Sequence, residues 1–336
     1  MKTKLRKTYN YLIRAAIILI SYGFIYYELF YKRDLNELLQ VYYDQWQTDF
    51  FFVVLALVIV LIFVNWGFEA KKWQYLIKKI EEISFIDSYK AVLLGVSVSA
   101  FTPNRIGEYL GRVFILKKAN HWEGIFITII GSFSQLIATL TCGYIGLMYI
   151  IPRYWDIESY FDYNLTWLVY MLGVISILFL LAMYYNISLI SVLVEKYLSK
   201  KWKRFNSYVA VFKKYSNNEL SNVLLYSLIR YFIFNLQFYL LLRILGVNLP
   251  LLHSLFLTSV LYYALAIIPT IALTELGIRG SLAIFLFELY FSQNGGFTDK
   301  MGLAIFTASS TIWLLNIIIP ALIGTLFVYR LKFFRK

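Results

Sequence analysis

Long apolar blocks dominate the pattern of hydrophobic and polar positions along the chain. Six of these blocks are long enough, at about 20 residues, for one helix to cross a hydrocarbon core of about 30 Å. They are Tyr11–Phe30, Phe50–Phe68, Ile125–Ile151, Leu165–Tyr185, Val223–Leu245 and Met301–Val328. A transmembrane β-barrel would instead alternate apolar and polar residues in segments of about ten. The pattern therefore predicts an all-α polytopic membrane protein with about six full transmembrane helices.

Two further apolar segments are interrupted near their middle. Ser88–Leu116 is broken by the run Phe-Thr-Pro-Asn, which contains Thr102 and Pro103, and Leu251–Phe291 is broken between Pro269 and Thr274. Proline cannot continue a helix and its predecessor avoids helical angles, so each segment should form two helical arms. At about 1.5 Å per residue, the arms of the first segment are too short to span. We predict two broken, re-entrant hairpins, with two complete helices per segment as the alternative.

The residues beside the two breaks have the chemistry of helix starts. Thr102 is expected to cap the second arm of the first hairpin, with Pro103 at the first helical position. Thr274 indicates a similar restart in the second hairpin. Gly107 and Gly277 follow the two breaks, and we expect both to belong to these structural interruptions.

Composition and charge agree with a membrane protein. The 336 residues are 60% hydrophobic and only 15% charged, which is too little polar surface for a soluble domain of this size. The net charge is +13, and Lys and Arg gather in the pieces 1–14, 69–90, 117–123, 195–219 and 330–336. By the positive-inside rule, this predicts a multi-pass protein of the cytoplasmic (inner) membrane with both termini in the cytoplasm. A nucleic-acid partner is not expected, because the basic residues lie between apolar blocks.

The order of elements suggests an internal repeat. The segments 50–151 and 223–328 each read as a helix, a broken hairpin and a helix. Three crossings separate the two hairpins, so the hairpins would enter the membrane from opposite faces. We therefore expect a single integral membrane domain, 1–336, built from two inverted halves with a binding site near the midplane.

Two amphipathic stretches are expected at the cytoplasmic surface. In Lys71–Ser84, apolar residues such as Trp73 and Leu76 share one helical face, and in Ile187–Tyr215 residues such as Phe212 do the same among several lysines. The expected partner of these basic loops is a surface of anionic lipid.

Ionisable side chains inside the apolar segments are the candidate substrate-binding residues. They are Arg105, Glu108, Arg112, Arg230, Glu275 and Arg279. Charged groups are costly within a bilayer and mark a functional site by default. A Glu-x3-Arg pair follows each break, and an excess of arginine beside half-helix N-termini suits a phosphate or carboxylate. The alternative is that these residues form structural ion pairs that hold each hairpin together.

Other chemistry is not indicated by the sequence. No His, Cys or carboxylate grouping has the spacing of a metal site, and no Gly-x4-Gly-Lys-Ser/Thr loop is present. We therefore expect no metal and no cofactor.

The run from Thr102 to Arg112 resembles the Pro-x-Arg-x-Gly-Glu-x3-Arg signature of the lysylphosphatidylglycerol synthase transmembrane-domain family, also called flippase-like integral membrane proteins. The resemblance extends over nearly the whole chain in length, block order and broken segments. It implies a bacterial protein that moves or binds a lipid, with the head group held by the re-entrant half-helices. The second region departs from the family pattern, because Glu275 precedes Gly277 where the family usually has Gly-x-x-Glu.

We therefore expect a lipid translocator whose substrate is a membrane lipid. One alternative is an integral membrane enzyme acting on a lipid phosphate or lipid-linked sugar, and another is a non-transporting scaffold. The multiple peptide resistance factor, which the family includes, carries a separate soluble domain that aminoacylates phosphatidylglycerol. The present chain ends at Lys336, soon after its last apolar block, so we do not expect aminoacyl transfer. Glu108 and Glu275 are the only carboxylates deep in the apolar segments, and both are expected to pair with arginines, which argues against a free catalytic base, so we expect no enzymatic activity. A homo-oligomer is possible.

Overall fold

The structure is a computed structural model that describes residues 40–43, 46, 50–99, 102, 106–154, 166–197, 203–268 and 272–328. For residues 166, 203, 204, 272–275 and 328 it describes the backbone alone. All regular secondary structure within these residues is helical, so the predicted all-α class is confirmed. The predicted span Tyr11–Phe30 lies outside the described residues.

Five helices of the described part are long and apolar enough to cross a membrane, and they correspond to the other five predicted spans. The fifth span, Asp299–Phe327, is a continuous helix that contains one π-helical turn. The helices are α3 (Phe51–Ile77), α4 (Phe85–Ser99), α5 (Gly107–Val113), α6 (His121–Tyr154), α7 (Thr166–Tyr185), α8 (Ser188–Tyr197), α9 (Lys203–Val209), η4 (Ala210–Lys214), α10 (Asn217–Ile244), α11 (Leu251–Ile267), α12 (Ala272–Gln293), α13 (Asp299–Trp313), η5 (Leu314–Ile318) and α14 (Ile319–Val328). The protein is a multi-pass membrane protein.

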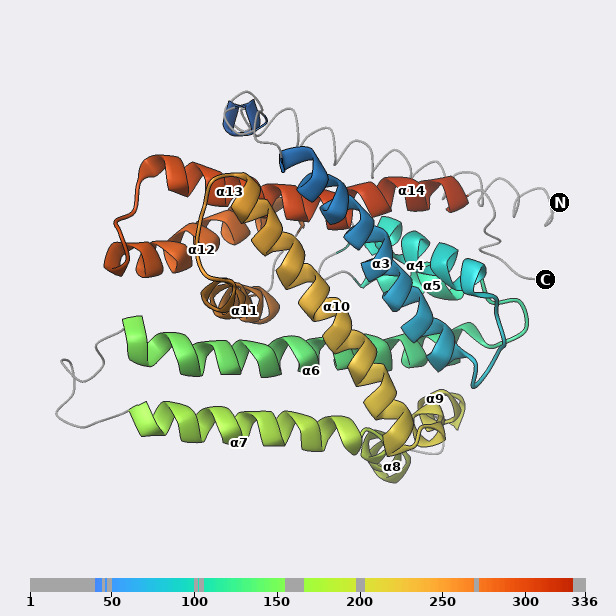
Figure 1. Ribbon diagram of the computed structural model, residues 1–336. Coiled ribbons are helices and arrows are strands. Elements are labelled where there is room, and N and C mark those ends of the chain that lie inside the picture. The colour runs from blue at the N-terminus through green and yellow to red at the C-terminus, as the bar shows by residue number, and fades with distance from the viewer. Residues whose placement is uncertain are drawn as a thin grey trace.

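The two long helices α3 and α10 pack against each other at the centre of the molecule (Figure 1). The helices α6 and α7 run side by side along one flank, and α11 packs on α6. On the other side, α4 packs on both α5 and α14. The interior between α3, α6 and α10 is therefore enclosed by elements from both halves of the chain.

The first break divides a helical hairpin into arms of unequal length. The helix α4 has 15 residues and ends at Ser99, and α5 has only 7 residues and begins at Gly107. At about 1.5 Å per residue, neither arm reaches across a core of about 30 Å. These lengths are those expected of a re-entrant hairpin, and re-entry itself stays a prediction.

The predicted cap at this break was placed too early in the chain. The N-cap residue of α5 is Ile106, which offers no side-chain hydrogen bond. Thr102 still satisfies the start of the helix, because its Oγ1 accepts a hydrogen bond from the backbone N–H of Gly107 at 2.9 Å. The helix therefore begins four residues after the predicted position at Pro103, which lies outside the described residues.

Close contact between glycines holds the two arms together. A Cβ atom on Gly111 would lie 2.6 Å from the Cα of Gly95, which faces it from α4. A Cβ on Gly107 would lie 2.8 Å from Thr102 Oγ1 and would also meet the Val98 carbonyl. The backbones of α4 and α5 can approach this closely only because these positions have no side chain.

The second break also differs in detail from the sequence prediction. The helix α11 ends at Ile267 and α12 begins at Ala272, so the break falls where Pro269 predicted it. Thr274 was wrongly predicted as the restart, because the helix starts two residues earlier. Gly277 lies inside α12 and does not belong to the break. Pro269 itself lies outside the described residues.

The first amphipathic stretch is not a surface element. The helix α3 continues without interruption to Ile77, and Trp73 and Leu76 are fully buried in the core. In the second stretch Phe212 is also buried and packs edge-to-face on Phe126 of α6. Tertiary packing therefore covers the apolar faces that the sequence predicted to lie on lipid.

The helix α8, which lies beside α9 where α7 ends and α10 begins, does carry exposed apolar surface (Figure 1). The large exposed residues of α8 are Leu189, Ile190, Val192, Leu193 and Tyr197.

Candidate functional site

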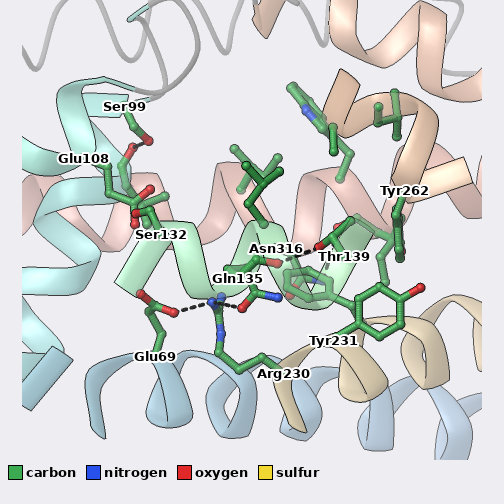
Figure 2. Close-up of a pocket in the computed structure, with 18 of the residues that line it drawn as sticks. Glu69, Ser99, Glu108, Ser132, Gln135, Thr139, Arg230, Tyr231, Tyr262 and Asn316 are labelled. Atoms are coloured by element: carbon green, nitrogen blue, oxygen red, sulfur yellow. Dashed lines mark hydrogen bonds and ion pairs between the residues drawn. The ribbon is translucent and has the colours of Figure 1, made fainter. Parts of the chain in front are cut away.

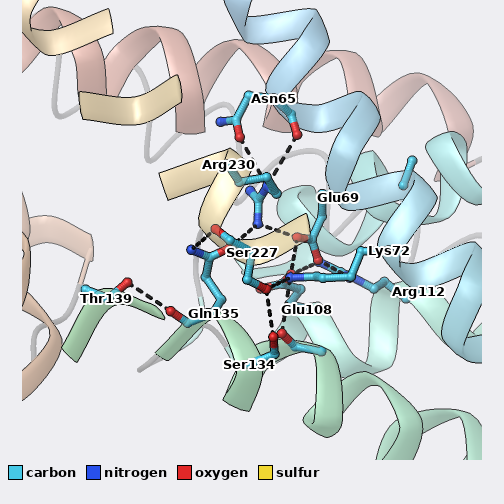
Figure 3. Close-up of polar contacts among 12 residues, drawn as sticks. Asn65, Glu69, Lys72, Glu108, Arg112, Ser134, Gln135, Thr139, Ser227 and Arg230 are labelled. Carbon is cyan, nitrogen blue, oxygen red and sulfur yellow. Dashed lines mark hydrogen bonds and ion pairs between the residues drawn. The ribbon is translucent and has the colours of Figure 1, made fainter. Parts of the chain in front are cut away.

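A buried carboxylate, Glu69 of α3, is the centre of the candidate site (Figure 3). Its side chain is only 5% exposed and pairs with three cations. Glu69 Oε2 lies 2.8 Å from Lys72 Nζ, one turn along the same helix. Glu69 Oε1 accepts a hydrogen bond of 2.7 Å from Arg112, and Oε2 also pairs with Arg230. One carboxylate therefore joins α3, α5 and α10.

The short helix α5 supplies Arg112 and Glu108 on one face. Arg112 is only 1% exposed and uses its two terminal nitrogens on different partners, Nη1 on Glu69 and Nη2 on Glu108. The pair Glu108–Arg112 is the i, i+4 pair that the sequence predicted. Because the side chain of Glu108 is 23% exposed, this carboxylate is the more accessible of the two.

The helix α10 supplies Arg230, which is held from three sides. Its Nε donates to Asn65 Oδ1 at 3.1 Å, and its Nη1 donates to Gln135 Oε1 of α6 at 3.0 Å. The guanidinium also lies over the ring of Trp66, with its Cζ atom 5.3 Å from the ring centroid. These contacts fix the orientation of Arg230 beside Glu69.

The third cation, Lys72, is completely buried. Besides Glu69, its Nζ donates to the carbonyl oxygen of Gly131 at 3.1 Å and to Ser227 Oγ at 3.3 Å. Ser227 Oγ in turn lies 2.9 Å from Ser134 Oγ. The ammonium therefore has three acceptors, one for each of its donor hydrogens.

These five ionisable residues carry unequal charge. Glu69 and Glu108 contribute two negative charges, and Lys72, Arg112 and Arg230 contribute three positive charges. Burying charge is costly unless it is paired and hydrogen-bonded, and one cation in this group has no carboxylate to balance it. The group is therefore suited to accept one further negative charge.

A chain of buried amides continues from Arg230 into the core. Asn65 donates to Asn316 Oδ1 at 3.3 Å, and Asn316 donates to Gln237 Oε1 at 3.2 Å. Asn316 lies in the π-helical turn η5, an irregularity that is frequent at functional sites. The amides link α3 and α10 to the last transmembrane helix.

A cavity of about 660 Å³ opens beside the charged group (Figure 2). Glu69, Lys72, Glu108 and Arg230 line one part of it, and Arg279 of α12 lines it as well. Its remaining wall combines hydroxyl and amide side chains with apolar ones. These residues come from α3 to α6 and from α10 to η5: Trp66, Val96, Ser99, Thr102, Tyr109, Ser132, Gln135, Leu136, Thr139, Tyr231, Phe234, Tyr262, Leu265, Ala266, Ile267, Ile268, Ile312, Trp313, Asn316 and Ile317. A cavity of this composition suits an amphipathic ligand.

Some cavity-lining donors have no hydrogen-bond partner within the described part of the chain. Among them are the indole N–H groups of Trp66 and Trp313 and the hydroxyl of Tyr262. The two tryptophans are 8% and 2% exposed. Because an indole nitrogen can only donate, these positions call for acceptor oxygens on whatever enters the cavity.

The structure brings together part of the predicted site. Glu108, Arg112 and Arg230 meet around Glu69, whereas Arg279 lies elsewhere on the cavity wall, with its Cζ atom 5.8 Å from the centroid of Tyr262. Arg105 lies outside the described residues. Glu275 falls within α12, but its side chain is among those that the structure does not describe.

Glu69 and Lys72 were not among the predicted site residues, because both were assigned to a cytoplasmic piece after Phe68. The spacing of apolar residues in the sequence did indicate that Glu69 faces the core. Ile62, Trp66, Glu69, Trp73 and Leu76 follow one another at spacings of three and four, and all five are buried on one face of α3. Continuing the helical period past Phe68 would have placed Glu69 inside the bundle.

The comparisons with known proteins agree with this architecture. The family described as "Lysylphosphatidylglycerol synthase TM region" matches residues 11–319 of the chain. No curated protein and no solved structure matches it.

Proposed function

Because the chain belongs to the lysylphosphatidylglycerol synthase TM-region family, we propose that this membrane protein is a lipid translocator rather than an enzyme. The observation that carries the proposal is the surplus positive charge of the Glu69 group beside an amphipathic cavity. A lipid that crosses the bilayer must keep a charged head group out of hydrocarbon, and a cavity of this kind provides matching charge and hydrogen bonds.

In this proposal an anionic or amphipathic head group enters the cavity while the acyl chains stay in the membrane. Arg230 and Arg279 lie on the cavity wall and would contact the negative group. Glu108 pairs with Arg112 when the cavity is empty. The unpartnered indole donors of Trp66 and Trp313 would receive oxygens of the ligand.

The pairing of helices supports an inverted repeat, an arrangement that many transporters with alternating access share. Exchanging α3 with α10, α4 with α11, α5 with α12 and α6 with the α13–α14 helix turns each of the main contacts among these helices into an observed contact. The contact of α4 with α14 becomes that of α11 with α6, and α4–α5 becomes α11–α12. Two halves arranged in this way would expose the cavity to each leaflet in turn, in a bacterial cytoplasmic membrane with both termini inside.

Leaflet exchange in proteoliposomes tests the proposal. Fluorescent lipids with anionic, zwitterionic and cationic head groups are compared for the wild type, Glu108→Gln and Arg230→Gln. We expect exchange selective for the head group, and a loss of about tenfold or more in both variants, because each removes a charge-assisted hydrogen bond.

Arg243→Gln is the matched control, because Arg243 lies on the same helix as Arg230 but is exposed. It should exchange lipid at the wild-type rate. Exchange that survives unchanged in both Glu108→Gln and Arg230→Gln would refute the assigned site. Product formed from labelled lipid by the purified protein would favour an enzyme instead.

A further inference from the structure

We propose that Lys72 takes up one proton when an anionic head group enters the cavity, so that the proton and the head group bind together. The proposal rests on the proposed function, because it needs a negatively charged ligand beside the Glu69 group. It adds a second ligand, H⁺, and assigns the residue that holds it.

The charge balance of the group leads to this assignment. With Lys72 protonated, the three cations and two carboxylates leave one positive charge unbalanced in a buried site. With Lys72 neutral, Arg112 and Arg230 balance Glu69 and Glu108. A monoanionic ligand balances the group again only if Lys72 carries its proton. The empty and occupied cavities are therefore each neutral in a different protonation state.

Lys72 is the member of the group whose charge is most readily lost. The guanidinium groups of Arg112 and Arg230 stay protonated in proteins. Glu69 is held as a carboxylate by three cations. The charged groups around Lys72 are Glu69 on its own helix, Glu108 and Arg112 on α5 and Arg230 on α10, and α6 contributes the polar residues Ser134 and Gln135.

The hydrogen bonds around Lys72 suit both protonation states. The ammonium donates to Glu69, to the Gly131 carbonyl and to Ser227 Oγ, while the Ser227 hydroxyl can donate to Ser134, 2.9 Å away. The neutral amine has two donor hydrogens and a lone pair. If both hydroxyl groups rotate, the Ser134 hydroxyl donates to Ser227 Oγ, and the Ser227 hydroxyl donates to the lone pair of Lys72 Nζ. In both states Lys72 Nζ, Ser227 Oγ and Ser134 Oγ each keep a hydrogen-bond partner.

The cavity offers the proton a route to this site, because Lys72 is among the residues that line it. In this step the lone pair of Lys72 Nζ binds H⁺ and forms an N–H bond, which gives the ammonium. On release of the head group the same N–H bond breaks, and the proton returns to water with the anion.

Titration calorimetry on the purified, full-length protein in a neutral detergent tests this linkage. The probe is dihexanoyl phosphatidylglycerol, whose phosphodiester keeps a single negative charge over the range studied, and dihexanoylglycerol is the uncharged control. Heats measured in two buffers with different ionisation enthalpies give the number of protons bound. We expect about one proton per probe over the pH range in which Lys72 is neutral in the empty site, and affinity that falls up to about tenfold per pH unit as pH rises there.

Two variants identify the proton site. Lys72→Met leaves Glu69 two arginine partners and keeps the group neutral, and it should bind the probe more weakly with no proton uptake at any pH. Lys72→Arg keeps a permanent charge and should bind without proton uptake and with little pH dependence. Lys71→Met is the matched control, because Lys71 is the exposed neighbour; it should take up protons as the wild type does.

The outcomes separate the two proposals. Probe binding without proton uptake at any pH overturns the role of Lys72 and leaves the lipid site standing. Proton uptake that persists in either folded Lys72 variant also overturns it, because the proton would then bind elsewhere, for example at Glu108. If the wild type binds no probe and exchanges no lipid, the lipid translocator and the coupled proton both fail.

Discussion

At the residue scale, one carboxylate, that of Glu69, holds the buried charged residues together. Glu69 pairs with Lys72, Arg112 and Arg230 in a site that water barely reaches. A buried ion pair is weak support for stability, but removing one partner leaves the other charge unpaired in a poorly solvated site. The effect of a substitution on stability therefore depends on whether it leaves the positive and negative charges around Glu69 equal or unequal in number.

Glu69→Gln should be strongly destabilising, because it leaves three cations with a single carboxylate. We expect a loss of about 3–5 kcal/mol in the free energy of unfolding, measured by denaturant titration in detergent. Lys72→Met should be milder, since it leaves two cations and two carboxylates. Glu82→Gln is the control, because Glu82 forms an exposed pair with Lys78 and should leave the transition midpoint in place. Equal effects of Glu69→Gln and Glu82→Gln would contradict the central role of Glu69.

At the element scale, the hairpin of α4 and α5 depends on glycine rather than on large apolar residues. The helix α5 has 7 residues, too few for a stable isolated helix. Its stability must come from packing, and Gly111 allows it to rest directly on the backbone of α4 at Gly95. The same contact places Arg112 beside Glu69.

Gly111→Ala should therefore destabilise the hairpin. Its methyl group would lie 2.6 Å from Gly95 Cα and 2.9 Å from the Leu94 carbonyl oxygen, backbone atoms that can move only if the helices separate. We expect a loss of about 1–3 kcal/mol in thermal or denaturant unfolding. Gly67→Ala is the control on α3, where a Cβ meets nothing within 4 Å. That change should raise the free energy of unfolding slightly, by about 0.5–1 kcal/mol. If Gly111→Ala and Gly67→Ala changed the free energy of unfolding in the same direction, the proposed close contact would be wrong.

At the scale of the whole molecule, the charge distribution and the two hairpins together predict a topology. Lys78 and Lys118 flank the hairpin of α4 and α5, whereas Asn248 and Gln293 flank that of α11 and α12. The positive-inside rule predicts that the first pair lies in the cytoplasm and the second pair outside.

Cysteine labelling tests this arrangement. Single cysteines at these four exposed positions are made in a Cys142→Ala background, since Cys142 is the one cysteine of the chain. A membrane-impermeant maleimide should label Asn248→Cys and Gln293→Cys on intact cells, and Lys78→Cys and Lys118→Cys only after the membrane is opened. Labelling of the two ends of one hairpin from opposite sides would mean that this hairpin crosses the membrane once.

The sequence by itself determined the class, five spans of the described part of the chain and the places of the two breaks. Long apolar blocks can be stable only in a bilayer, and each break coincides with a proline, whose effect on a helix is local. The pairing of Glu108 with Arg112 was also predictable, because it depends only on helical spacing. The starts of α5 and α12 were misplaced by a few residues, since local capping signals are weaker than the packing that fixes where these arms begin.

Only the tertiary structure decided which charges share a site. Arg112 and Arg230 are far apart in the chain, and they meet because α5 and α10 both pack near α3, where Glu69 lies between them. The same packing buries Trp73 and Leu76, which a local pattern cannot distinguish from an interfacial face. A helical period shows that one side of α3 is apolar, but whether that side meets lipid or protein depends on helices distant in the sequence.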